Sequence, residues 1–102
     1  MSRDAIREMK KTLQAGMRAQ ASEEHRLGAA QAALALLERS VRMGHRRLAV
    51  LRLSEAVLLG AQVPDEHWRY CQDAAAASRD MGVQTLFAKA VQVAWAGREK
   101  GG

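Results

Sequence analysis

The residues best suited to bind a ligand are cations in the middle of the chain. Between Glu38 and Glu55 the sequence contains no acidic residue. It contains instead a cluster of basic residues, which are Arg39, Arg42, His45, Arg46, Arg47 and Arg52. A guanidinium pairs with a carboxylate or a phosphate through two hydrogen bonds. Several of these side chains lie around one tight turn at Gly44. The spacing therefore predicts an exposed basic patch, and solvated charge at a helix end is the alternative.

His67 and Cys71 are the one other pair whose spacing would suit metal binding or catalysis. Four residues apart on a helix, they could both touch one metal ion. A structural zinc site needs four ligands, and the other histidines are distant. Cys71 lies among apolar neighbours with nothing to lower its pKa, so a catalytic thiolate is not expected. We predict no enzymatic activity, no metal, no cofactor and no small-molecule substrate.

Composition restricts the fold more than the function. The 102 residues suit one domain, and a single proline with little β-branched alternation predicts an all-α protein. A net charge of +5 permits an acidic protein, nucleic acid or an anionic membrane as partner and selects none. Cys71 has no second cysteine to pair with, and the N-terminus has no apolar signal region, so we expect a cytoplasmic protein. The longest apolar run, Ala32 to Leu37, is too short to span a membrane, and a membrane partner is not expected.

Two helices are predicted in the first part of the chain. The first covers about residues 2–20 and is capped by Ser2. Its apolar stripe consists of Ile6, Met9, Leu13 and Met17, and we predict that this stripe binds a partner. Ser22 is a candidate N-cap for a second helix that runs to about Met43. With no proline between them, one continuous rod is an alternative.

Three more helices follow, joined in antiparallel hairpins. Gly44 is the natural end of the second helix, and the third covers about 46–59 and ends at Gly60. The third helix is apolar nearly all round, which is typical of burial on more than one face. The fourth covers about 64–80 and is ended by Met81-Gly82. The fifth covers about 83–96. Residues 1–97 are thus predicted to form one helical domain, with 3–20 as a possible separate docking helix, and residues 98–102 are predicted to form a disordered tail.

The chain contains an internal echo. Arg42-Met43-Gly44, followed by Leu48, Leu53 and Ala56, is matched 38 residues later by Asp80-Met81-Gly82, followed by Leu86, Val91 and Ala94. Over residues 27–97 the pattern resembles tetratricopeptide hairpins: Gly44, Ala49, Leu53 and Ala56 match the family's spacing, as do Gly82, Val91 and Ala94. Phe87 stands where the family has alanine, and the family's usual period is about 34. The resemblance implies stacked hairpins that grip a peptide or a helix; a plain helical bundle is the alternative.

These observations predict a small helical protein–protein interaction module, acting as an adaptor, chaperone or assembly subunit with a protein partner or as a homodimer. The alternative is a nucleic-acid-binding protein that uses the cluster at 39–52. The helix after Gly44 has too few polar residues to read bases, so such binding would be non-specific. The acidic helix at 64–80 could also meet the basic turn, within the chain or in a second copy.

Overall fold

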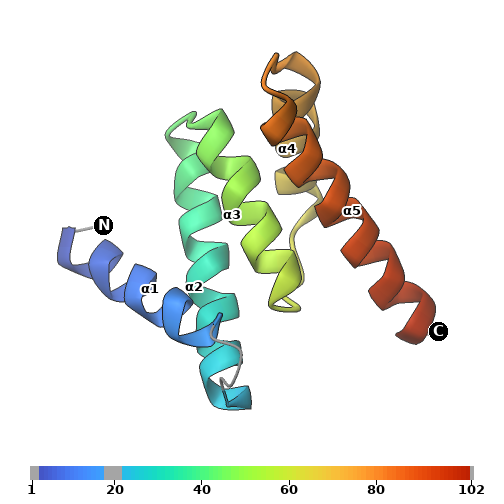
Figure 1. Ribbon diagram of the computed structural model, residues 1–102. Coiled ribbons are helices and arrows are strands. Elements are labelled where there is room, and N and C mark those ends of the chain that lie inside the picture. Colours follow the sequence, from blue (N-terminus) through green and yellow to red (C-terminus); the bar gives the residue numbers. More distant parts are fainter. Residues whose placement is uncertain (1–2, 18–21, 102) are drawn as a thin grey trace.

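The computed structural model describes residues 3–17 and 22–101, and these residues form helices without strands. The helices are α1 (Arg3–Gly16), α2 (Glu23–Arg42), α3 (Arg46–Leu58), α4 (Asp65–Ala77) and α5 (Met81–Gly101). α1, α2, α3 and α5 lie side by side in that order, and α4 lies behind the first part of α5 and also packs against α3 (Figure 1). The predicted all-α class is confirmed.

α1 and α2 are separate helices. α1 ends at Gly16 and packs along α2, so the single continuous rod is wrong. Ser22 caps α2 as predicted, because its Oγ accepts a hydrogen bond from the His25 N–H at 3.2 Å. The predicted cap at Ser2 and the predicted helical residues 18–20 lie outside the described residues.

Two helices end at glycines with a left-handed backbone. Gly44 follows α2 with a φ of +71°, and Gly60 follows the end of α3 with a φ of +80°. In the first of these turns the His45 N–H donates to the Ser40 carbonyl at 2.9 Å, and the second turn repeats the pattern. Such bonds satisfy carbonyls that the helix end leaves free. The helix ends predicted at these two glycines are confirmed.

The boundary between α4 and α5 differs from the prediction. α4 ends at Ala77, and Met81 and Gly82, which were predicted to end that helix, are the first residues of α5. Asp80 is the reason: its Oδ1 accepts a hydrogen bond from the Gly82 N–H at 2.8 Å, so the carboxylate caps α5. Gly82 does not take the left-handed conformation of Gly44. The two halves of the echo therefore differ at the turn.

α5 also extends past its predicted end. The sequence pattern predicts a helix end at Ala96, but the helix continues to Gly101. It thus includes residues 98–101, which we expected to form a disordered tail. No proline interrupts this stretch of the sequence.

α3 joins the two parts of the core. One cluster holds α3 against α4 and α5 and consists of Leu37, Ala49, Val50, Leu53, Val57, Cys71, Ala74, Ala75, Val83 and Ala90. The other holds α1 against α2 and consists of Leu13, Ala29, Ala32, Ala33, Leu36 and Ala56. Alanines dominate the second cluster, and their small side chains let the helix backbones come close. α3 contributes to both clusters.

One side of α3 stays in solvent. Leu48, Leu51 and Leu58 are 38%, 40% and 61% exposed. The shortest dimension of the molecule is 22 Å, which is about two helix diameters. Two layers cannot enclose a helix on all sides. The expectation that α3 is buried on more than one face is therefore wrong for this leucine side.

We expect Gly44→Ala to lower the free energy of unfolding by about 1 kcal/mol, because a side chain disfavours a positive φ. A Cβ at this position would meet no atom within 4 Å, so the effect comes from the backbone alone. Gly44→Asn should lose less, since asparagine tolerates this conformation. Urea denaturation followed by circular dichroism measures the difference. Equal stability of Gly44→Ala and the wild type would contradict the assignment of this turn.

Candidate functional site

The basic patch forms at the turn between α2 and α3, as predicted in part. Arg42, His45, Arg46 and Arg47 are exposed there, at the end of α2 and the start of α3. Arg39 lies one turn earlier on α2 and is half-buried. The positive charge is thus concentrated at one end of the α2–α3 hairpin.

Two of these cations are paired within the chain. Arg42 lies 3.2 Å from the Glu38 carboxylate on the same helix. Arg47 Nη2 lies 2.9 Å from Oδ2 of Asp80. Asp80 thus does two things, since its other oxygen caps α5. We predicted that the basic turn could contact the acidic helix at 64–80 within the chain, and the Arg47–Asp80 pair is such a contact. Asp80 itself lies in the turn after α4.

Arg52 does not belong to the exposed patch. Its Nη1 lies 2.8 Å from Oε1 of Glu55, one helical turn away, and the two side chains are only 12% and 15% exposed. A guanidinium held in this way is not available to an external anion. Arg52 was grouped with the other basic residues because of its place in the sequence, from which its ion pair with Glu55 is not apparent.

An apolar groove begins beside the patch, between α3 and α5. Its lining consists of His45, Arg47, Leu48, Leu51 and Leu86, and its volume is about 560 Å³. We call these residues the α3–α5 groove. The leucines form an apolar floor and the two basic side chains lie at one end. This groove was not predicted from the sequence. The one signal for the groove in the sequence is the internal repeat, because Leu48 and Leu86 are equivalent positions of that repeat.

The apolar stripe predicted to dock a partner is instead used within the chain. Leu13 is 2% exposed in the cluster between α1 and α2, and Ile6 and Met9 are partly buried against the same cluster. Met17 is the exception and is exposed beyond the end of α1. The stripe packs on α2 because the alanines of α2 offer it a flat apolar surface. Three of the four residues are therefore not free for a partner.

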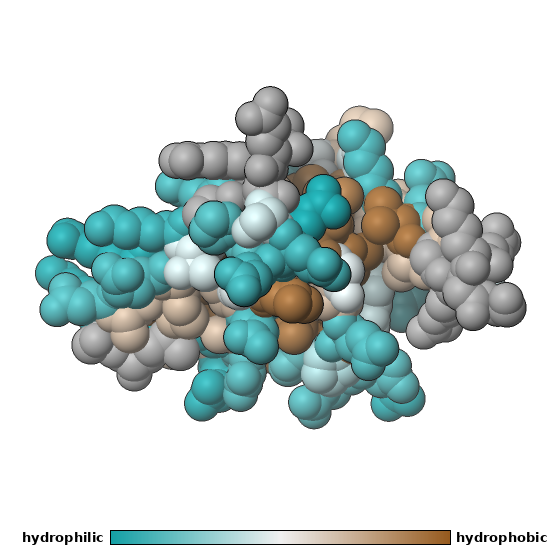
Figure 2. Space-filling view, turned by 90° about the horizontal axis from the view of Figure 1, so that it is seen from below, coloured by the Kyte–Doolittle hydropathy of each residue, from teal (hydrophilic) through white to brown (hydrophobic). Residues whose placement is uncertain are grey.

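Apolar surface also reaches the opposite end of the molecule, where α2 begins and α3 ends. Figure 2 looks at this end and shows hydrophobic residues between hydrophilic ones. Leu27 and Leu58 are exposed there, and Leu27 lines a shallow hollow with Glu23, Arg26 and Leu59. The charges around this hollow are mixed, so it does not indicate the charge of a ligand.

Cys71 is not placed to act as a nucleophile. Its side chain is fully buried in the core, and burial raises the pKa of the thiol to about 12. The thiol is therefore protonated at neutral pH. Within the described residues no three His, Cys, Asp or Glu side chains come together in a possible metal site. Over the same residues, no helix is both long enough and apolar enough to cross a bilayer.

Comparison with protein families, with curated proteins and with solved structures found no match to this chain. The resemblance to tetratricopeptide hairpins therefore stays a prediction. The function has to be argued from the chain's own surfaces, and the α3–α5 groove with its basic end is the surface where shape and charge point to the same kind of ligand.

We expect Glu55→Ala to lower the free energy of unfolding by about 1–3 kcal/mol, because it leaves the half-buried Arg52 without its charge partner. Glu38→Ala removes a carboxylate from an exposed pair with Arg42, and should change stability by no more than about 0.5 kcal/mol. Urea denaturation of both variants makes the comparison. Equal losses would show that the Arg52–Glu55 pair is no more important than a surface pair.

Proposed function

We propose that the protein is a small helical interaction module that binds an acidic, amphipathic helix of a partner protein in the α3–α5 groove. The observation that carries the proposal is the combination of exposed leucines and unpaired cations on one surface. An adaptor, a chaperone and an assembly subunit all use such a surface. A cytoplasmic setting fits a chain whose cysteine is a buried thiol.

The leucines indicate a helical ligand. Leu48 and Leu51 are one turn apart on α3, and Leu86 faces the same hollow from α5. Grooves of this kind accept the apolar face of a helix, whose anchor residues recur every three or four positions. Water leaves these leucines on binding, and each fully buried leucine contributes about 1.5–3 kcal/mol.

The cations indicate an acidic ligand. Arg47 is already paired with Asp80, but Arg46 and His45 take part in no ion pair among the described residues. His45 lines the groove where α3 begins, and Arg46 is its neighbour at the same end of the helix. Carboxylates on a partner helix would meet these side chains, increase the rate of association and set the orientation of the helix.

Nucleic acid is the alternative ligand for the same cations. Phosphates would pair with the exposed arginines, and the binding would weaken steeply with salt. This alternative leaves the three leucines of the groove without a role. A protein ligand uses both the leucines and the cations, and for this reason we favour it.

A random peptide library selected on the immobilised protein tests the proposal. Light scattering of the free protein is run first, because a homodimer could occupy the groove. We expect the enriched peptides to be acidic and to carry leucine-like residues at helical spacing. Enrichment of basic peptides, or no enrichment at low salt while a DNA duplex binds, would contradict the proposal.

Fluorescence anisotropy with one enriched peptide then locates the site. Leu51→Asn should weaken binding about tenfold, because it removes apolar contact area from the groove. Leu58→Asn is the matched control, an exposed leucine of the same helix outside the groove, and should bind like the wild type. Arg46→Gln should weaken binding and reduce its salt dependence, whereas Arg69→Gln on α4 should do neither. Equal effects of the two leucine variants would place the site elsewhere.

A further inference from the structure

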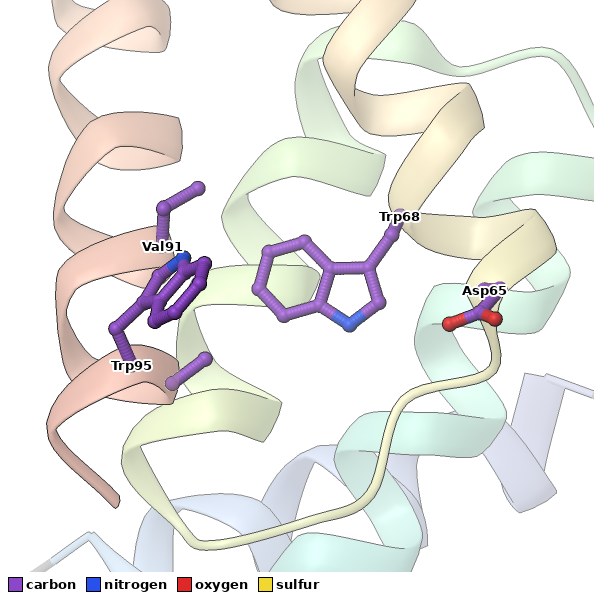
Figure 3. Close-up of a pocket in the computed structure, with 5 residues that line it drawn as sticks. Asp65, Trp68, Val91 and Trp95 are labelled. Atoms are coloured by element: carbon purple, nitrogen blue, oxygen red, sulfur yellow. The ribbon is translucent and has the colours of Figure 1, made fainter. Parts of the chain in front are cut away.

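A second, smaller pocket lies between the start of α4 and the C-terminal half of α5. Its volume is about 160 Å³, and it is lined by Asp65, Trp68, Val91, Ala94 and Trp95. Figure 3 shows the two indoles extending toward one another, Trp68 from α4 and Trp95 from α5, with the Asp65 carboxylate at the start of α4 on the far side of Trp68. We call these five residues the tryptophan pocket. None of them belongs to the α3–α5 groove.

The tryptophan pocket is partly preorganised. Trp68 is half-buried, and its ring makes an edge-to-face contact with Phe87 of α5 at a centroid distance of 6.2 Å. Such contacts hold an aromatic ring in one orientation. Trp95, in contrast, is 59% exposed. One wall of the pocket is thus fixed, and the other is an exposed indole with an unused face.

We propose that the tryptophan pocket binds an alkylammonium group. The face of an indole attracts cations more strongly than any other side-chain ring, and aromatic pockets recognise quaternary ammonium groups in this way. Asp65 supplies a negative charge and forms no ion pair among the described residues. A neutral apolar ligand would make no use of that carboxylate.

The position of Asp65 also has an opposing effect. It is the first residue of α4, where the helix dipole is positive and repels a cation. Glu66 lies in the same first turn and adds a second carboxylate. The full negative charge of Asp65, which lines the pocket, exceeds the half charge of the helix end.

The size of the pocket indicates a small head group with an apolar stem. A pocket of 160 Å³ is below the range of about 300–1,000 Å³ that holds drug-sized ligands. A wider hollow of about 510 Å³ shares Trp68 and Ala94 with it and continues past Val57, Val63 and Val93. An ammonium group can lie beside Trp68 while its alkyl chain follows this hollow. Both a lysine side chain and a free choline-like molecule have this chemistry.

Isothermal titration calorimetry with choline tests the pocket. The control ligand is 3,3-dimethyl-1-butanol, which has the shape of choline without its charge, at constant ionic strength. We expect choline to bind and to shift the tryptophan emission saturably, and the neutral alcohol to bind at least about tenfold more weakly. Equal binding of the two ligands, or no binding of choline, would overturn the proposal.

Variants then locate the cation. Trp95→Leu and Asp65→Asn should each weaken choline binding about tenfold. Both residues are exposed, so the fold should persist, and circular dichroism checks this. Asp73→Asn, an exposed carboxylate farther along α4, is the matched control and should bind like the wild type. Equal binding by Trp95→Leu and the wild type would overturn the proposal.

A second set of ligands distinguishes the source of the cation. Peptides carrying lysine or trimethyllysine, tested beside free choline, show whether the ammonium group arrives on a protein chain. Tighter binding of a peptide indicates a protein ligand, and equal or tighter binding of choline indicates a small molecule. In either case the Leu51→Asn variant should bind the cation normally, since the α3–α5 groove is a separate surface.

Discussion

The structure depends on the packing of α3, which is shared by both halves of the core. Ala49, Val50, Leu53 and Ala56 are completely buried on one side of this helix. Three other helices, α2, α4 and α5, pack against it, and in a molecule two helices thick they cover only that side. The leucines on the other side remain in contact with water. The apolar surface of the α3–α5 groove is therefore a direct consequence of how the core is built.

The charges around the groove follow from a second constraint, the position of α5. Asp80 caps α5 through one oxygen and binds Arg47 through the other. This exposed ion pair joins the start of α5 to the start of α3, while the packing of Leu86 against the core places it beside Leu48. It also neutralises one arginine of the turn and leaves its neighbour Arg46 unpaired. The carboxylate that caps α5 thus also changes the charge that the groove presents to a ligand.

Local signals in the sequence predicted the fold well. Ser22, Gly44 and Gly60 act within one helical turn, so their roles as caps could be recognised without knowledge of distant contacts. Asp80 and Gly82 also act locally, but the pair suits either a helix end or a helix start. α5 begins there because the Asp80 side chain accepts a hydrogen bond from the second residue of the helix. That geometry is not visible in the sequence.

The site was less predictable, because it depends on contacts between distant residues. The exposed cations at 42–47 could be recognised from the spacing alone. Arg47 pairs with Asp80, however, and Leu51 shares a hollow with Leu86. The sequence cannot say which side of an all-round apolar helix its neighbours will cover. For the same reason the stripe containing Ile6, Met9 and Leu13 was assigned to a partner, although α2 covers it.

Leucine methyl NMR with an acidic amphipathic peptide selected on the protein tests the central claim most directly. The claim predicts that the peptide shifts the methyl signals of Leu48, Leu51 and Leu86, while those of buried Leu36 and of exposed Leu58 stay in place. Shifts concentrated at Leu27 and Leu58, at the opposite end of the molecule, would contradict it. So would a bound peptide that leaves the groove leucines unchanged.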